Sequence, residues 1–300
     1  MSVQHFAKIT RGLDKIARVV TGRQMAGRNL TVYPDDVFLT SYPRSGNTWA
    51  RFLIGNLIYQ DEPVTFLNIE ERIPEIYFNS DHQMRALARP RILKSHECFQ
   101  PHYPRVIYIM RDPRDVAVSF YHHNVKAGNI ADDYPIDDFI PRFIAAAFDG
   151  RWGSWAEHVQ SWTLLRKDRP EFILLRYEEM KANPERELLR LTEFLDRCSF
   201  RRIDSSLETL QHAIELSSPE RMRKLEKAQA KKWVLTRATR ADKPFVRTAQ
   251  SGGWRSALSP ASVAAIELAW GPIMQNLGYE LSSMSYPPQP SALSHTVGYK

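Results

Sequence analysis

The junction at residues 37–49, which read VFLTSYPRSGNTW, constrains the fold of this chain more than any other stretch. An apolar run of strand-forming residues ends abruptly at a polar turn, and apolar residues at helical spacing follow from Trp49 to Ile58. This pattern predicts a strand, a tight loop and the N-terminus of a helix. The backbone N–H groups and the dipole of such a helix attract an anion. Arg44 adds a cation, and Gly46 lets a ligand approach the backbone closely.

The loop is spaced like the phosphate loop G-x4-G-K-[ST] of nucleoside triphosphatases, but it lacks the lysine of that motif. Ser41 and Gly46 occupy the two glycine positions, and Thr48 is kept. Asn47 stands where the lysine belongs, and the cation has moved forward to Arg44. Because that lysine reaches the terminal phosphates, the loop predicts a phosphate site and argues against an ATPase. An ordinary turn before a helix remains an alternative for the loop taken alone.

Three further apolar runs predict strands, and cations lie at the ends of two of them. These runs cover residues 92–96, 105–110 and 172–175. Strands that alternate with helical segments predict an α/β fold with a mainly parallel sheet, which binds ligands at the carboxyl ends of its strands. Arg44, Lys94 with His96, and Arg111 would then meet at one edge of the sheet. Such an edge favours a ligand with several anionic groups.

The composition excludes some classes of protein and leaves others open. No apolar run approaches the roughly 18 residues that a membrane span needs, and the N-terminus lacks the apolar core of a signal peptide. Cys98 and Cys198 are the two cysteines of the 300-residue chain, which predicts a reducing compartment, and we expect a cytoplasmic protein. The net charge of +7 is compatible with nucleic acid, a membrane surface or an anionic cofactor.

The two ends of the chain differ from the part between them, so we expect one domain over residues 31–281. Residues 1–30 predict a basic amphipathic extension that could lie on an anionic membrane, although docking on its own domain is favoured. Residues 282–300 are rich in Ser and Pro and predict a disordered tail. The basic run at residues 221–240 is typical of a solvated helix face.

Five blocks of this sequence resemble the PAPS-dependent sulfotransferase family in its cytosolic-type form. The family's 5′-phosphosulfate loop, Y-P-K-S-G-T-T-W, is similar to residues 42–49, and its K-[TS]-H motif is similar to residues 94–96. Its R-[ND]-x-[KR]-D-V-A-V-S-x-Y-H segment, which binds the 3′-phosphate, is similar to residues 111–122, RDPRDVAVSFYH. G-S-W-x-x-H-V and Y-E-D-M-K-x-[ND]-P resemble residues 153–159 and 177–184.

The resemblance implies a P-loop-like three-layer fold, with a central, mainly parallel β-sheet flanked by helices. It also implies transfer of a sulfuryl group from PAPS to an acceptor hydroxyl without a metal. His96 would be the general base, and Lys94 and Arg44 would neutralise charge on the sulfuryl group and the leaving phosphate. The cofactor-binding residues that it implies are Arg44, Ser45, Gly46, Asn47, Thr48, Trp49, Arg111, Ser119, Tyr177 and Arg247.

The sequence departs from the family pattern at several positions. Arg44 replaces the usual Lys, which keeps the charge but presents a planar fork, and Asn47 replaces a Thr. The family's late R-K-G-x-x-G-[DE]-W-[KR] is only partly kept at residues 247–255, RTAQSGGWR. The dimerisation pattern of cytosolic members, K-x-x-x-T-V-x-x-x-E, is poorly matched from Arg255 onward, so the oligomeric state stays open.

The sequence also bears on the class of acceptor and leaves two alternative functions. We expect a small-molecule acceptor, an apolar or aromatic alcohol being favoured over a carbohydrate or lipid hydroxyl, in a pocket walled by residues 120–152. The aromatic residues expected there are Phe139, Phe143, Phe148 and Trp152. The rivals are a P-loop nucleotide kinase or NTPase and a basic nucleic-acid-binding protein. The missing lysine disfavours the first, and no recognition motif supports the second. His122, His123 and His158 are interpreted as structural.

Overall fold

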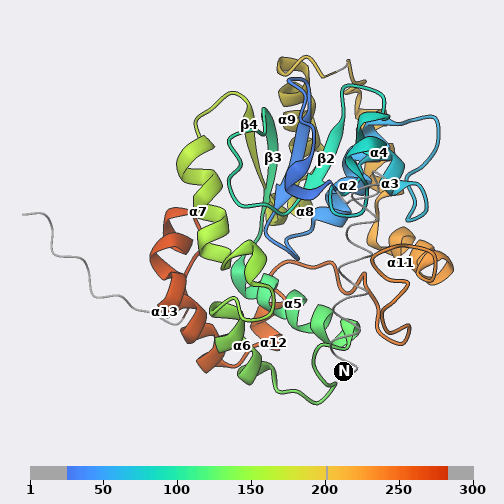
Figure 1. The fold of residues 1–300 in the computed structure, drawn as a ribbon. Coiled ribbons are helices and arrows are strands. Elements are labelled where there is room, and N and C mark those ends of the chain that lie inside the picture. The colour runs from blue at the N-terminus through green and yellow to red at the C-terminus, as the bar shows by residue number, and fades with distance from the viewer. Residues whose placement is uncertain (1–25, 201, 283–300) are drawn as a thin grey trace, which may run out of the picture.

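Four parallel strands form the central sheet of the computed structural model, which describes residues 26–200 and 202–282 (Figure 1). Their order is β2-β1-β3-β4. The strands are β1 (Val37–Ser41), β2 (Ile92–Ser95), β3 (Arg105–Met110) and β4 (Phe172–Arg176). Each of the predicted strands is confirmed. In register, Thr40 lies opposite Ser95 on one side and Tyr108 on the other, so the ends of these three strands lie at one edge.

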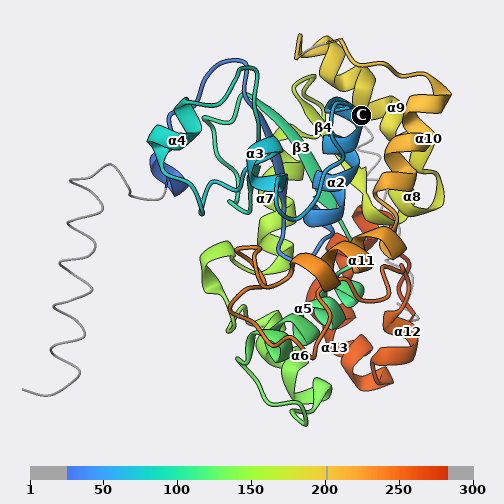
Figure 2. The same cartoon turned by 90° about the vertical axis from the view of Figure 1, so that its right-hand side faces the viewer.

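Helices cover both faces of the sheet, as Figures 1 and 2 show. The longer helices are α2 (Asn47–Ile58), α5 (Pro113–Ala127), α6 (Ile136–Ile144), α7 (Trp155–Arg166), α9 (Pro184–Arg197), α10 (Leu207–Leu216), α11 (Pro219–Gln229) and α13 (Pro260–Asn276). The short ones are η1 (Gly27–Asn29), α3 (Ile69–Arg72), α4 (Asp81–Arg85), η2 (Gly150–Trp152), α8 (Tyr177–Ala182) and α12 (Trp254–Ala257). The predicted three-layer α/β architecture is confirmed.

Alternate strand residues supply the two apolar cores. Phe38 and Tyr108 pack with α5, α6, α7 and α13 on one face of the sheet. Leu39 and Ile107 pack with α2, α9 and α10 on the other face. Because both faces are covered, the strands read as continuous apolar runs rather than as alternating ones.

Serine caps fix where several helices begin. The Ser154 hydroxyl accepts from the Glu157 N–H, and the Glu157 carboxylate accepts from the Ser154 N–H, so α7 begins with a capping box. Ser259 caps α13, and Pro260 occupies its first turn. The helices predicted from near Ser154 and over roughly residues 261–277 are therefore confirmed.

A covering segment, residues 230–253, links α11 to α12 and is held by buried charges (Figure 2). The Glu226 carboxylate accepts from the N–H groups of Phe245 and Val246 at 2.5 and 2.9 Å. Lys126 of α5 donates to the carbonyl of Arg240 at 2.9 Å. These bonds position a stretch of chain that has no regular secondary structure of its own.

The predictions for the ends of the chain lie largely outside the described residues. Residues 1–25 of the expected basic extension and residues 283–300 of the expected tail belong to that part. Ala26 is buried, and its N–H donates to the carbonyl of Asn79 at 2.8 Å. Over residues 26–200 and 202–282, every helix is too short or too polar to cross a lipid bilayer.

Leu39→Ala tests the packing of the central strand. Leu39 is fully buried between β1 and the helices of one face, so truncation leaves a cavity and should lower the free energy of unfolding by about 2–5 kcal/mol. Leu164 on α7 is 76% exposed, and Leu164→Ala should change it by less than about 0.5 kcal/mol. Urea denaturation measures both. Equal losses for the two variants would contradict the assignment of Leu39 to the core.

Candidate functional site

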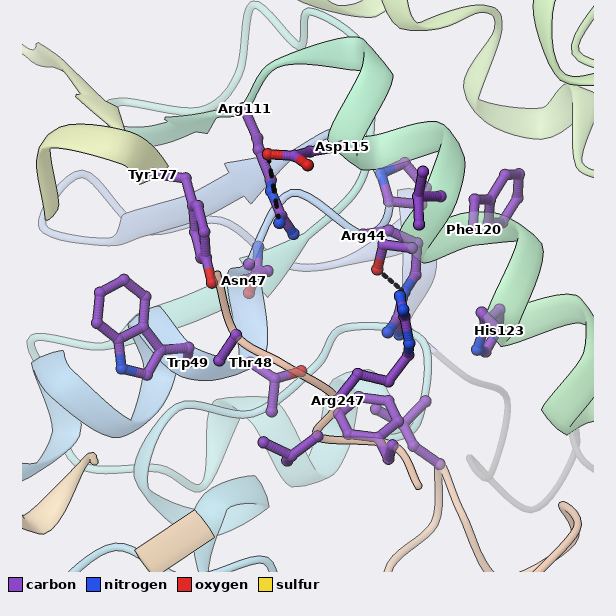
Figure 3. A pocket seen from close by; sticks show the side chains of 18 of the residues that line it. Arg44, Asn47, Thr48, Trp49, Arg111, Asp115, Phe120, His123, Tyr177 and Arg247 are labelled. Carbon is purple, nitrogen blue, oxygen red and sulfur yellow. Dashed lines mark hydrogen bonds and ion pairs between the residues drawn. The ribbon is translucent and has the colours of Figure 1, made fainter. Parts of the chain in front are cut away.

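A cavity of about 480 Å³ lies at the carboxyl edge of the sheet (Figure 3). Its walls come from the loop after β1, the ends of β2 and β3, the N-terminal half of α5, the start of α8 and the covering segment. Parallel strands bring these segments together because their carboxyl ends meet at one edge. The cavity therefore lies where the sequence predicted a binding site.

All but one of the predicted site residues line this cavity. Those that do are Arg44, Gly46, Asn47, Thr48, Trp49, Lys94, His96, Arg111, Ser119, Tyr177 and Arg247. Ser45 is the exception, because its side chain is buried within the loop. Its hydroxyl has no hydrogen-bond partner among the described residues. Its N–H donates to the Tyr42 carbonyl at 3.2 Å, which closes the turn.

The loop after β1 adopts left-handed backbone conformations at Arg44, where φ is 69°, and at Gly46. Gly46, the N-cap of α2, has a φ of 97°, in the left-handed region. A Cβ placed on Gly46 would lie 2.4 Å from Cδ2 of Tyr177, because the Tyr177 ring packs against the loop. The N–H groups of the first turn of α2 have no partner within the helix and remain for a ligand.

Asn47 contributes to the site through its backbone more than through its side chain. Its side-chain amide donates to the Ser41 hydroxyl at 3.1 Å and lies 3.5 Å from the Leu39 carbonyl. These bonds tie the start of α2 to the end of β1. The Asn47 N–H belongs to the first turn of the helix and is the group left for an anion.

Two aromatic rings form one end of the cavity. The rings of Trp49 and Tyr177 meet edge to face with centroids 5.4 Å apart. The indole N–H of Trp49 donates to the Ser217 carbonyl at 3.0 Å, which fixes the ring. In Figure 3, Tyr177 lies between Trp49 and Arg111, whose guanidinium is 4.1 Å from the Tyr177 centroid. A flat, partly polar group fits such a surface.

Three arginines surround the cavity with little negative charge to balance them. Arg44 donates through Nε to the Ser119 hydroxyl at 3.3 Å, and its guanidinium lies 4.9 Å from the centroid of Phe245. Burial, together with repulsion from Arg111 and Arg247, lowers the pKa of Arg44 to about 10. Among the described residues, neither Arg44 nor Arg247 forms an ion pair with a carboxylate. A bound anion would relieve this repulsion.

Asp115 connects Arg111 to the covering segment. Its carboxylate lies 3.8 Å from the Arg111 guanidinium and accepts from the N–H groups of Gly252 and Trp254 at 2.7 and 3.0 Å. Arg111 also donates to the Gln250 carbonyl at 2.8 Å. The cation at the end of β3 is thus positioned by contacts on both sides of the cavity.

His96 is held as a neutral imidazole in one tautomer. Its Nδ1 lies 2.7 Å from the Ser41 carbonyl, and since a carbonyl only accepts, Nδ1 carries the proton. In the neutral ring Nε2 is then an unprotonated acceptor. Burial and the charge of Lys94 lower the pKa of His96 well below 6.5. His96 can therefore accept a proton at neutral pH.

His158, interpreted from sequence as structural, forms a hydrogen bond with the backbone of His96. Its Nε2 donates to the His96 carbonyl at 3.0 Å, and the Tyr108 hydroxyl lies 2.8 Å from its Nδ1. His158 and Tyr108 are fully buried, and burial lowers the pKa of His158 to about 4. His123, also interpreted as structural, lines the cavity, and burial lowers its pKa to about 3.

Glu75 lies in the site although the sequence did not indicate it. Its Oε1 is 2.6 Å from Nζ of Lys94, and both side chains are 5% exposed. Glu75 belongs to an irregular stretch that pairs with β2 only through an isolated bridge to Lys94. In the sequence, Glu75 stands out only as a carboxylate between Pro74 and Ile76. This pattern is too weak to predict that the residue lies beside a lysine 19 positions away.

The expected aromatic wall is only partly correct. Trp152 lines the cavity, as does Phe120. Phe139 and Phe143 are fully buried in the apolar core instead, where their rings stack on one another and on neighbouring aromatics. Aromatic composition alone could not separate core from pocket, because both environments favour these side chains.

The described residues also contain no group of three or more His, Cys, Asp and Glu side chains placed to hold a metal ion. The polar groups available at the cavity include cations, backbone N–H groups and the neutral histidine His96.

The site and fold were compared with known proteins. The family model of the sulfotransferase domain matches residues 34–278. The chain is 29% identical over 245 residues to bovine sulfotransferase 1A1, covering 76% of this chain and 80% of that protein. It is 30% identical over 241 residues to bovine sulfotransferase 1E1, covering 74% and 78%.

Two solved structures have a similar fold. Mouse sulfotransferase SULT7A1, complexed with PAP, gives a TM-score of 0.65 at 23% identity and covers 84% of this chain and 88% of that one. Retinol dehydratase in complex with retinol and PAP gives a TM-score of 0.65 at 19% identity, covering 90% and 88%.

A set of glycine variants tests the geometry of the loop. Gly46→Ala adds backbone strain and displaces the Tyr177 ring, so the free energy of unfolding should fall by about 3 kcal/mol. Gly128 has a φ of 74° and open space around it, so Gly128→Ala should cost only the backbone strain, about 1–2 kcal/mol. Urea denaturation measures each loss.

Gly150→Ala is the control with neither penalty, since Gly150 has no heavy atom near its Cβ position and lacks a positive φ. It should change stability by less than about 0.5 kcal/mol. Should Gly46→Ala cost no more than Gly128→Ala, the Tyr177 ring would not be packed firmly against the loop.

Proposed function

The chain belongs to the family of sulfotransferases, enzymes that transfer sulfo groups, and we propose that it takes this group from PAPS and passes it to a hydroxyl of a small-molecule acceptor. One observation supports this proposal most directly. Arg44, Arg111 and Arg247 share a cavity with the first-turn N–H groups of α2 and with a neutral histidine. A donor with 5′- and 3′-anionic groups suits the arginines, and an acceptor hydroxyl suits the histidine.

The residues of the cavity fit a donor of this kind. The loop N–H groups and Arg44 would hold the 5′-phosphosulfate, and the solved structures of similar fold hold PAP. Arg111 lines the cavity, and its buried Nε lacks a hydrogen-bond partner among the described residues, which supports an anionic ligand at this place. Residues for the 3′-phosphate and the adenine would be Arg111, Ser119, Arg247, Trp49 and Tyr177, with Ser45, Gly46, Asn47 and Thr48 at the 5′ end.

The proposed mechanism assigns one task to each polar side chain. PAPS, when bound, supplies a sulfuryl group attached to a phosphate oxygen. His96 accepts the proton of the acceptor hydroxyl at Nε2 while Nδ1 keeps its bond to the Ser41 carbonyl. Lys94 and Arg44 stabilise the negative charge that develops on the leaving phosphate. The covering segment excludes water from the site, since its Phe245 and Val246 line the cavity.

An apolar or aromatic alcohol is the acceptor that we propose. Tyr77, Phe78, Phe120 and Trp152 line the cavity, and the Trp152 ring lies 6.0 Å from that of His96. Flat apolar surfaces beside the base favour a hydroxyl on an apolar body. A screen of alcohols, sugars and lipid hydroxyls with labelled PAPS separates this class from the carbohydrate and lipid alternatives.

We further propose residues 31–281 as the catalytic domain and a cytoplasmic location. The family match over residues 34–278 supports the first. Cys98 and Cys198 are both free thiols, which supports a reducing compartment.

Ligand-induced stabilisation tests the choice of donor. Adenosine 3′,5′-bisphosphate should raise Tm more than ATP with Mg²⁺ or an oligonucleotide does, because it combines a 5′-phosphate with a terminal 3′-phosphomonoester for Arg111. At about 100 times Kd the stabilisation should be about 2.7 kcal/mol. Thermal unfolding of the whole chain measures this shift. An equal or larger shift with ATP would favour the NTPase alternative.

AMP and an Arg247 variant provide the matched controls. AMP lacks the 3′-phosphate and should stabilise the protein less than the bisphosphate. Arg247→Gln should reduce the difference in Tm shift between the bisphosphate and AMP, because Arg247 lines the cavity together with Arg111. An unchanged difference would remove Arg247 from the 3′-phosphate site.

His96→Ala tests the base. Without an acceptor for the proton, kcat should fall about 10²–10⁴-fold, while the affinity for adenosine 3′,5′-bisphosphate stays within about threefold. Steady-state kinetics with labelled PAPS and calorimetry measure the two quantities. A large loss of affinity instead would mean that His96 holds the donor.

The pH profile provides the independent check on His96. A base with a lowered pKa stays unprotonated as pH falls through 6.5, so kcat/KM of the wild type should decline only below that value. The residual activity of His96→Ala should lack this acidic limb. His82 is exposed at the start of α4, and His82→Ala should keep the wild-type profile.

A further inference from the structure

Glu75, which forms an ion pair with Lys94, lines the cavity but has no role in the proposed mechanism. Lys94 Nζ lies 2.6 Å from Glu75 Oε1, and each side chain is 5% exposed. Both residues line the same cavity as His96, two residues further along the chain from Lys94. A carboxylate this close to a cation that is meant to bind anions needs a physical reason.

The burial of Lys94 explains why a carboxylate lies beside it. Removing an ammonium from water favours its neutral form, and burial is the main cause that lowers the pKa of Lys94. The carboxylate of Glu75 acts in the opposite direction and favours the charged form. Breaking a buried pair by removing one partner leaves an uncompensated charge, which is strongly unfavourable. Lys94 thus depends on Glu75 to remain a cation in the cavity.

Glu75 is itself held in place. Its N–H donates to Oε2 of Glu70 at 2.9 Å, and Oε1 of Glu70 lies 2.8 Å from Nη2 of Arg51. Arg51 is buried in α2 and donates through Nε to the Ile73 carbonyl at 2.9 Å. The Lys94 N–H donates to the Pro74 carbonyl at 2.8 Å. The backbone on both sides of the ion pair is therefore fixed before any ligand binds.

We propose that Glu75 is a positioning residue for sulfuryl transfer, which orients the Lys94 ammonium at the carboxyl edge of the sheet and keeps it charged. This inference rests on the proposed function, because it concerns the charge that Lys94 contributes there. Glu75 acts through Lys94 and receives no proton from the acceptor. The charged and titratable groups around Lys94 are Glu75 and Glu70 from residues 69–76, Arg51 from α2, and His96 from the end of β2.

The positive charge proposed for Lys94 determines the direction in which kcat changes with pH. Lys94 acts as a cation, so activity is lost as pH rises through its pKa. Without the carboxylate that pKa falls further, and the alkaline limb of the kcat profile moves to lower pH. The acidic limb, which His96 sets, should change less.

Glu75→Gln, measured from about pH 5 to 10, is the test. Kcat should fall about tenfold, and its alkaline limb should move by about one pH unit to lower pH. The affinity for adenosine 3′,5′-bisphosphate should stay within about threefold of wild type, since the Glu75 side chain pairs with Lys94 and with none of the residues proposed for the 3′-phosphate. Glu75→Asp keeps the charge and should restore most of the alkaline limb. An unmoved limb with kcat within about twofold of wild type, or a faster enzyme, would overturn the inference.

A double variant separates a role through Lys94 from an independent one. If Glu75 acts through Lys94, then Glu75→Gln combined with Lys94→Met should be as slow as Lys94→Met alone. A double variant slower by the product of the two single effects would contradict the proposal. A wild-type rate for Lys94→Met would remove Lys94 from the proposed function and the inference with it. A slow Lys94→Met with an unaltered Glu75→Gln would overturn the inference alone.

The matched control is a buried ion pair at the opposite end of the same two strands. Arg91 Nη2 lies 2.5 Å from Asp36 Oδ2, just before β2 and β1 begin, and both side chains are at most 1% exposed. Asp36→Asn breaks this pair and should lower Tm, yet it should leave the alkaline limb where it is. A shift of the limb in Asp36→Asn would show that the pH effect follows stability and would overturn the role of Glu75.

Discussion

The parallel pairing of β1 between β2 and β3 is the constraint on which the rest of this structure depends. Because Thr40 lies opposite both Ser95 and Tyr108, the segments that follow these strands meet at one edge. That edge holds the loop with Gly46, the neutral His96 and the cation Arg111, which lie far apart in the sequence. Apolar cores on both faces of the sheet fix the pairing, so the site is as rigid as the packing beneath it.

Two of the cations at this edge, Arg44 and Arg111, lie against aromatic rings rather than in close ion pairs. The Arg44 guanidinium faces the Phe245 ring and the Ser119 hydroxyl, while that of Arg111 lies on the Tyr177 ring. These contacts leave the charge available to a ligand, whereas a close ion pair would neutralise it. Buried charges hold the covering segment instead, with Asp115 binding its N–H groups at one end. Asp115 links this segment to the site, because its carboxylate also lies 3.8 Å from the Arg111 guanidinium.

Lys94 and His96, at the end of β2, are held in opposite protonation states. The histidine is neutral because burial and the neighbouring cation disfavour its charged form, and the Ser41 carbonyl fixes its tautomer. The lysine has a carboxylate partner that offsets burial. A base without its proton and a cation with its proton can therefore lie two residues apart at the same pH.

The sequence by itself determined the strands, the α/β class and the polar residues at the strand ends, because apolar periodicity and strand-end residues are local signals. The strand at residues 105–110 and the loop with Gly46 needed no tertiary information. Only the tertiary structure decided that Ser45 is buried within the loop, that Phe139 belongs to the core and that Glu75 faces Lys94. Each of these depends on which side chain meets which across a long sequence separation, and no local pattern encodes that contact.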